Sequence, residues 1–222
     1  MLNVLITGAT GFVGSHLCDF LLKNVPDITI YASRRWRSRD ENIKHLYGDP
    51  RVIFIESDLL DPVSMMELVR VSCPQYIFHF AAQSNPGASF LIPIKTVETN
   101  TLGTINLLEA IRHFRDTGAC NPRIISVSTS EVYGMPLEEE VPIKETNPIR
   151  AANPYSISKV GHDLFSQYYQ KAYGLDIIIT RMFSHEGARR GKQFALSSFA
   201  RQIAIHEESY YMTRVSRCEN YA

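Results

Sequence analysis

The feature that most constrains the fold is a glycine-rich turn close to the N-terminus. Gly8, Gly11 and Gly14 recur at every third position of the segment TGATGFVG. Residues 4–8 before the turn are mostly apolar and β-branched, as a buried parallel strand requires. The apolar residues after it follow the helical period. A strand, a glycine turn and a helix in this order indicate a dinucleotide site, in which the start of the helix faces a pyrophosphate.

Each glycine has its own task in such a site. Gly8 permits the tight turn, Gly11 lets the backbone approach the pyrophosphate, and Gly14 allows close packing of helix on strand. The alternative is a glycine-rich turn without a ligand, since a glycine triplet alone is weak evidence. The predicted cofactor contacts of this loop are Gly8, Thr10, Gly11, Phe12, Val13 and Gly14.

The composition excludes several classes of protein. The 222 residues, 45% of them hydrophobic and 21% charged, suffice for one well-buried core. The net charge is zero and no basic tail occurs, so we expect no nucleic-acid partner. Four cysteines without CxxC spacing favour reduced cytosolic thiols, and the histidines show no metal-ligand spacing. With no membrane-length apolar run and no room for a signal peptide before the first strand, we expect a soluble cytoplasmic protein without a metal site.

Strands and helices alternate along the chain. The predicted strands are residues 4–8, 28–32, 52–55, 76–80, 123–127 and 175–180. After the first helix, the predicted helices are residues 62–71, 96–114 and 153–173. This alternation predicts an α/β fold with a doubly wound parallel sheet, whose ligands bind beyond the carboxyl ends of the strands.

The loops that follow the second, third and fourth strands carry further candidates. Arg34 and Arg35 stand where NAD sites usually have an acidic residue, and arginine favours the 2′-phosphate of NADP. A solvated basic loop is the alternative. The other two loops are expected beside the adenine and along the cofactor, or they are ordinary loops. Their candidate cofactor residues are Asp58, Leu59, Ala81, Ala82, Gln83 and Ser84.

The last predicted helix begins with a possible catalytic pair. Asn153 is a suitable N-cap and Pro154 suits the first helical position. Tyr155 and Lys159 are four residues apart and therefore share one helix face. An ammonium near a phenol lowers the phenol pKa from its usual value of about 10, which makes tyrosine a usable base for a sugar hydroxyl. The alternative is a surface pair on an amphipathic helix.

Thr129 and Glu131, at the end of the fifth strand, decide the chemistry. Tyrosine, lysine and a hydroxyl suffice to move a hydride at a sugar carbon. An additional carboxylate can remove a proton next to the ketone so formed, which permits elimination of water. The alternative for Glu131 is a solvated loop carboxylate. The predicted catalytic residues are Thr129, Glu131, Tyr155 and Lys159.

These motifs together resemble the extended branch of the short-chain dehydrogenase/reductase superfamily, which works on nucleotide sugars and has a Rossmann-type sheet. Thr-Ser-Glu at 129–131 resembles the GDP-mannose 4,6-dehydratase family. Epimerases lack this glutamate, and dTDP-glucose 4,6-dehydratases have Asp-Glu at the same place. The resemblance implies a lyase that uses NADP rather than NAD, a GDP-linked sugar substrate and a homo-oligomer. In that family the loop matching Arg34 and Arg35 reaches a neighbouring subunit.

The block at 182–191 also resembles that family, which implies that His185 and Arg190 contact the cofactor. Ser184 departs from the family's asparagine, which puts substrate contacts there in doubt.

The resemblance covers about residues 2–208, and we assign residues 1–208 to one NADP-binding Rossmann domain with the catalytic residues. Residues 209–222 form an atypical tail, whereas family members continue into a region that grips the substrate. We therefore expect an absent or truncated substrate subdomain and weak substrate binding. An epimerase, a 4-keto reductase and a catalytically silent NADP-binding fragment stay open as alternatives.

Overall fold

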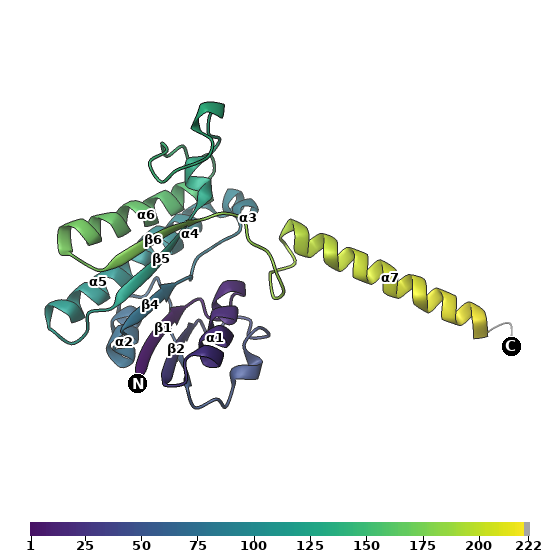
Figure 1. The fold of residues 1–222 in the computed structure, drawn as a ribbon, viewed down its shortest axis with the longest axis horizontal. Helices are drawn as coiled ribbons and strands as arrows, with labels where there is room; N and C mark the ends of the chain where they lie inside the picture. The colour runs from purple at the N-terminus through teal and green to yellow at the C-terminus, as the bar shows by residue number, and fades with distance from the viewer. Residues whose placement is uncertain (220–222) are drawn as a thin grey trace. The chain divides into compact units, whose positions relative to one another are not determined.

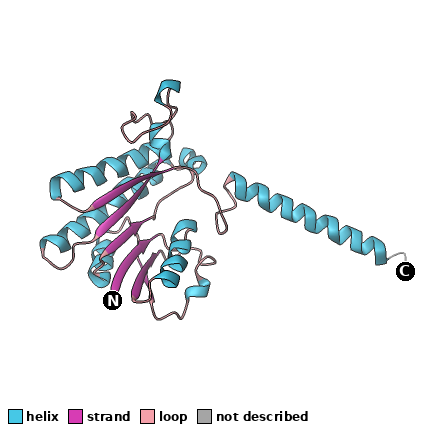
Figure 2. Ribbon diagram, viewed as in Figure 1, coloured by secondary structure: helices cyan, strands magenta, loops and turns pink. Residues whose placement is uncertain are grey.

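The computed structural model describes the backbone of residues 1–219 and the side chains of residues 1–207. The chain forms two compact units, Met1–Ser184 and His185–Ala222. The first unit contains every strand of the described chain (Figures 1 and 2).

A six-stranded parallel sheet forms the centre of the first unit. Its strands lie in the order β3-β2-β1-β4-β5-β6. Their bounds are β1 (Leu2–Thr7), β2 (Ile28–Arg34), β3 (Val52–Glu56), β4 (Tyr76–His79), β5 (Arg123–Thr129) and β6 (Ile177–Met182). The strand order reverses between β1 and β4, which is where such sheets bind ligands. The predicted doubly wound fold is confirmed.

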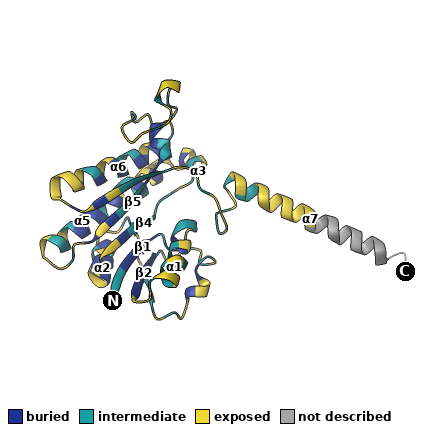
Figure 3. Ribbon diagram, viewed as in Figure 1, coloured by how far each residue is buried: buried dark blue, intermediate teal, exposed yellow. Residues whose placement is uncertain are grey.

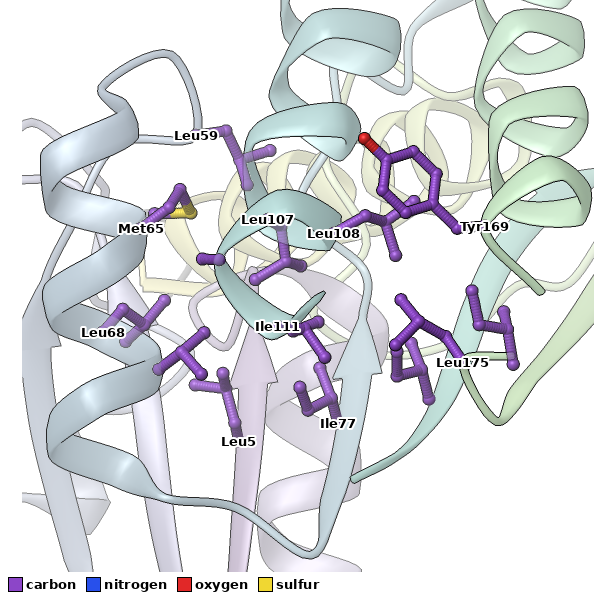
Figure 4. Packing of buried hydrophobic residues seen from close by; sticks show 14 residues of the cluster. Leu5, Leu59, Met65, Leu68, Ile77, Leu107, Leu108, Ile111, Tyr169 and Leu175 are labelled. Carbon is purple, nitrogen blue, oxygen red and sulfur yellow. The ribbon is translucent and has the colours of Figure 1, made fainter. Parts of the chain in front are cut away.

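Helices cover both faces of the sheet, and the alternation of side chains along β1 shows why. Leu5 points into one hydrophobic core, with α2 (Pro62–Ser72), α5 (Gly103–Asp116) and α6 (Pro154–Tyr173). Figure 4 shows this core around Leu107, Leu108 and Ile111. Val4 and Ile6 point into the opposite core, with α1 (Phe12–Asn24) and β2. Figure 3 shows β1 and β2, near the middle of the sheet, as largely buried, whereas the edge strand β6 is mostly intermediate.

The segment between β4 and α5 differs from the prediction of one helix over 96–114. It consists of two short helices, α3 (Pro86–Leu91) and α4 (Pro93–Val97), and a turn of π-helix at Glu98–Leu102 before α5. A proline opens each short helix at its first turn, where its missing N–H costs nothing. The π-helical turn contains Asn100, whose buried side chain bonds to the loop after β4 and to α6.

The second unit contains the helix α7 (Ala195–Glu219), which the sequence patterns did not predict. The predicted domain boundary between residues 208 and 209 falls inside α7 and stays a prediction. The side chains of the expected tail, 209–222, lie outside the described residues.

None of the helices in the described part of the chain combines the length and apolar character needed to cross a bilayer.

Candidate functional site

The glycine turn between β1 and α1 has no room for side chains at two positions. Gly8 has a φ of +71°, and a Cβ there would lie 2.8 Å from the Ala81 nitrogen. A Cβ on Gly14 would lie 2.4 Å from the carbonyl oxygen of Gly8. Gly11 is the N-cap of α1, and therefore no side chain caps this helix start. A helix start with no side-chain cap and no acidic residue in its first turn suits a pyrophosphate.

Arg34, at the end of β2, is held in place by aromatic residues. Its Nη1 donates a hydrogen bond to the Tyr47 hydroxyl at 2.8 Å, and Tyr47 in turn donates to Asp40 at 2.9 Å. The guanidinium also lies over the rings of Tyr47 and Phe54. Arg35 is exposed, so the two predicted arginines have different surroundings. A cation fixed at the end of β2 fits the predicted preference for a 2′-phosphate.

The loops after β3 and β4 are anchored by backbone contacts. The Asp58 side chain accepts a hydrogen bond from the Leu60 N–H at 3.0 Å. The Leu59 side chain is part of the hydrophobic core, which sequence reasoning did not predict. In the second loop, which runs from Ala81 and Ala82 to Ser84, Gln83 N–H donates to Asn100 Oδ1 at 2.7 Å. The cofactor contacts predicted for these two loops stay predictions.

The start of α6 carries the predicted tyrosine and lysine, and its predicted caps are confirmed. Asn153 is the N-cap and a proline follows at the first helical position. The backbone N–H of Tyr155 donates to Ser89 Oγ on α3 at 3.1 Å. Lys159 is buried, and its Nζ donates to the Val127 carbonyl on β5. Burial lowers the pKa of Lys159 to about 7, while the nearby Asp163 carboxylate opposes the shift.

Glu131 lies at the same end of α6. It belongs to a short 3-10 turn, Ser130–Tyr133, that begins where β5 ends. Thr129 caps this turn by accepting a hydrogen bond from the Glu131 N–H at 3.3 Å. The Glu131 carboxylate accepts a hydrogen bond from Asn153 Nδ2 at 2.9 Å. The structure therefore links Thr129 and Glu131 to the helix that carries Tyr155 and Lys159.

Beneath Lys159 lies a buried polar chain that sequence reasoning missed. Thr104 Oγ1 donates to the Asn100 carbonyl, so it accepts from both His79 Nε2 and His162 Nδ1, at 3.0 and 2.8 Å. The opposite ring nitrogens then accept from the Thr7 and Ser126 hydroxyls. Burial lowers the pKa of His79 to about 3, and burial likewise holds the pKa of His162 well below its usual value. Both imidazoles are therefore neutral at pH 7.

A buried ion pair completes the surroundings of Lys159. Asp163, one turn further along α6, accepts two hydrogen bonds from Arg181 on β6, at 2.8 and 3.1 Å. Although burial opposes ionisation, the Arg181 hydrogen bonds lower the pKa of Asp163. Arg181 also donates to the Tyr133 hydroxyl at 3.0 Å, which ties β6 to the turn that contains Glu131. The sequence feature that could have pointed to Asp163 is its spacing of four residues from Lys159, which places both on one face of α6.

His185 and Arg190 belong to the second unit. Arg190 pairs with Glu186, with 2.9 Å between Nε and the carboxylate oxygen. Their predicted cofactor contact stays a prediction. Among the described side chains there is no group of three or more metal-ligating residues, and Cys18, Cys73 and Cys120 are thiols.

The fold and this arrangement of glycine turn, Tyr-x-x-x-Lys pair and strand-end glutamate define an extended short-chain dehydrogenase/reductase. Residues 5–216 match the sequence profile of the family described as GDP-mannose 4,6 dehydratase. The chain belongs to that family.

Curated relatives and solved structures agree with this assignment. The chain is 34% identical to GDP-mannose 4,6-dehydratase of Yersinia enterocolitica over 92% of its own length and 55% of the relative's. It is also 34% identical to UDP-glucuronic acid decarboxylase 3 of Arabidopsis thaliana, over 85% of this chain and 52% of the relative. The chain thus spans about half the length of these relatives.

Two solved structures show the cofactors of similar folds. The dTDP-glucose 4,6-dehydratase of Streptomyces venezuelae, with NAD and TYD bound, matches with a TM-score of 0.82 and 30% identity. That match covers 91% of this chain and 62% of the other. RMD from Pseudomonas aeruginosa, complexed with NADPH, matches with a TM-score of 0.72 and 27% identity, over 94% of this chain and 62% of the other.

Proposed function

We propose that this chain is the cofactor-binding and catalytic part of an NADP-dependent GDP-sugar 4,6-dehydratase. One observation carries the proposal: the Glu131 carboxylate is hydrogen-bonded to Asn153, the cap of the helix that bears Tyr155 and Lys159. A carboxylate at this place supplies the base that elimination of water needs and that hydride transfer alone does not need.

The residues around the glycine turn fit a nicotinamide dinucleotide. Gly8, Gly11 and Gly14 leave the backbone bare at the start of α1, where the pyrophosphate would bind. Arg34 and Arg35 supply positive charge for a 2′-phosphate, which supports NADP over NAD. NADP, when bound, accepts a hydride from the sugar and later returns it.

Tyr155 accepts the proton of the sugar hydroxyl in the first step. Lys159 lies one turn further along α6, and its positive charge favours the ionised phenol. Burial lowers the pKa of Lys159 to about 7, and the Asp163 carboxylate nearby favours the charged form. The Thr129 hydroxyl, at the end of β5, donates a hydrogen bond to the same sugar oxygen.

Glu131 removes the proton from the carbon next to the ketone in the second step. The Glu131 carboxyl, which then carries this proton, gives it to the hydroxyl on the following carbon, so that the hydroxyl leaves as water. The two steps therefore use different side chains, Tyr155 in the first turn of α6 and Glu131 in the 3-10 turn that follows β5. A nucleotide-sugar epimerase or a 4-keto reductase needs only the first step.

The test follows the two steps separately. The polypeptide is incubated with NADP and a panel of nucleotide sugars, and a 4-keto-6-deoxy product is sought. Glu131→Gln is expected to stop proton exchange next to the ketone and leave NADP binding intact. Tyr155→Phe is expected to block the first hydride transfer, so that no reduced cofactor forms. Normal dehydration by Glu131→Gln would exclude the dehydratase and leave an epimerase or a reductase.

We further propose a cytoplasmic homo-oligomer without nucleic-acid or membrane partners. The oligomer is supported by apolar side chains exposed on α3 and α4, namely Phe90, Leu91 and Ile94. The cytoplasm is supported by the composition and by the thiol state of the described cysteines.

A further inference from the structure

Asn153 uses its side-chain amide in two directions. Its Oδ1 accepts a hydrogen bond from the Ser156 N–H at 2.8 Å, and its Nδ2 donates to Glu131 Oε2 at 2.9 Å. The orientation of the amide is determined, because a backbone N–H requires the oxygen and an ionised carboxylate requires the NH₂ group. Ser156 Oγ in turn accepts from the Asn153 N–H at 3.0 Å, which closes a capping box.

A helix cap alone does not require asparagine. Aspartate and serine cap helices about as well. An aspartate here would place a second carboxylate against Glu131, and a serine hydroxyl is a single atom that does not span the distance from Ser156 N to Glu131 Oε2. An amide of this length joins the two groups, because its acceptor and its donor lie on separate atoms.

The contact leaves Glu131 with one held oxygen and one open oxygen. Oε2 accepts the hydrogen bond from Asn153, whereas Oε1 accepts none from the described side chains or backbone. A long acidic side chain on a turn otherwise samples several rotamers, and a fixed rotamer presents the same lone pair in every molecule.

We propose that Asn153 is a positioning residue for Glu131, which it holds so that Oε1 faces the sugar proton to be removed. This inference rests on the proposed dehydratase function. It assigns the cap of α6 to the second step, whereas Tyr155 and Lys159 on the same helix belong to the first.

The test measures the two steps in variants that keep the cap. Asn153→Asp preserves size and capping oxygen, and Asn153→Ser preserves a cap without the second donor. Both are expected to slow deuterium incorporation next to the ketone at least tenfold more than they slow formation of reduced cofactor. Asp61, which caps α2 in front of Pro62, offers the matched control. Asp61→Ser replaces one cap by another as Asn153→Ser does, and is expected to leave the ratio of the two rates unchanged.

Equal slowing of both steps in the Asn153 variants would show a purely structural cap and overturn the proposal, as would no slowing of either. A second measurement does not depend on turnover. If the wild-type polypeptide makes no 4-keto product, that result contradicts the proposed function but leaves the positioning role of Asn153 to be tested by this measurement. Glu131→Ala is expected to move the nuclear magnetic resonance signal of the Asn153 side-chain amide protons. An unmoved signal would overturn the positioning role independently of turnover.

Discussion

At the residue scale, Lys159 is proposed to assist catalysis through its positive charge, and burial of that charge lowers stability. Burial lowers its pKa to about 7, from 10.5 in the unfolded chain. Between these values the unfolded chain binds a proton that the folded chain does not, so the wild type loses stability as the pH falls from about 10.5 to 7. Below about pH 7, Lys159 is protonated in both the folded and the unfolded chain, so the lost stability no longer changes with pH. Lys159→Met lacks this loss.

We therefore expect Lys159→Met to gain stability relative to the wild type at pH 7 and to lose that advantage towards pH 10, by about 1.4 kcal/mol per pH unit. The lost hydrogen bond to Val127 lowers the variant's stability by about 1 kcal/mol at every pH. The diagnostic quantity is therefore the change with pH of the stability difference between variant and wild type. Thermal melting at pH 6.5 and 9.5 measures it. Lys171→Met, on the exposed end of α6, is the control and should show no slope.

Local chemistry explains which site residues could be predicted from the sequence. Asn153 and Pro154 were predicted at their correct helix positions, because cap preferences depend on neighbouring residues alone. The buried chain through His79, Thr104 and His162 was not predicted. It joins three elements far apart in the sequence, and His79 and Thr104 are 25 positions apart. The sequence alone does not reveal which group a histidine in an apolar strand hydrogen-bonds to, nor which ring nitrogen carries its proton.

At the scale of elements, the same chain joins β4, α5 and α6 and makes the protein sensitive to acid. Burial lowers the pKa of His79 to about 3 and lowers that of His162, so unfolding below pH 6.5 takes up protons. Stability should fall with decreasing pH by about 1.4 kcal/mol per unit for each histidine. Urea unfolding at pH 7, 6 and 5 measures this slope. His79→Gln together with His162→Gln should flatten it, whereas exposed His113→Gln should not.

The loop that follows β2 carries the prediction on cofactor preference. Arg34 is already fixed by Tyr47 and Phe54, and a charge-assisted contact with phosphate contributes about 1.5–3 kcal/mol. We expect NADP to bind more tightly than NAD, and removal of Arg34 and Arg35 to narrow the preference at least tenfold. Calorimetric titration of both cofactors measures it. Arg37→Ala, whose guanidinium stacks on Trp36, serves as control. Equal or tighter binding of NAD by the wild type would refute the phosphate argument.

Elements with strong patterns were predicted and short ones were not. The six strands were predicted to within two residues at each end, since runs of β-branched residues bounded by turns are clear signals. The sixth strand was placed at 175–180 and lies at Ile177–Met182. Helices α3 and α4 span six and five residues, too few for an amphipathic period, and the π-helical turn depends on the tertiary contacts of Asn100.

At the scale of the whole molecule, the first unit holds both hydrophobic cores and all four predicted catalytic residues, whose roles stay predictions. The helix of the second unit was not predicted, although Leu196, Phe199 and Ile203 have the i, i+3, i+7 spacing of one helix face. Its described apolar residues, Leu196, Phe199, Ile203 and Ile205, are exposed. Apolar spacing over two turns is shorter than the stretch in which the helical period is a clear signal.

The last prediction concerns substrate binding by the 222-residue polypeptide. A nucleotide-sugar enzyme binds the remote nucleotide to position the sugar, which requires protein on both sides of the cleft. The predicted residues of the first unit, from Gly8 to Lys159, are proposed to form the cofactor side, and the chain spans 55% of its Yersinia relative. We expect NADP to bind and to stabilise the first unit, by about 2.7 kcal/mol at a hundredfold excess over Kd. We expect GDP-mannose to bind weakly, with turnover far below that of a full-length relative. Calorimetric titration of GDP-mannose in the presence of NADP measures this. Micromolar binding together with abundant 4-keto product would show that these 222 residues suffice for substrate recognition.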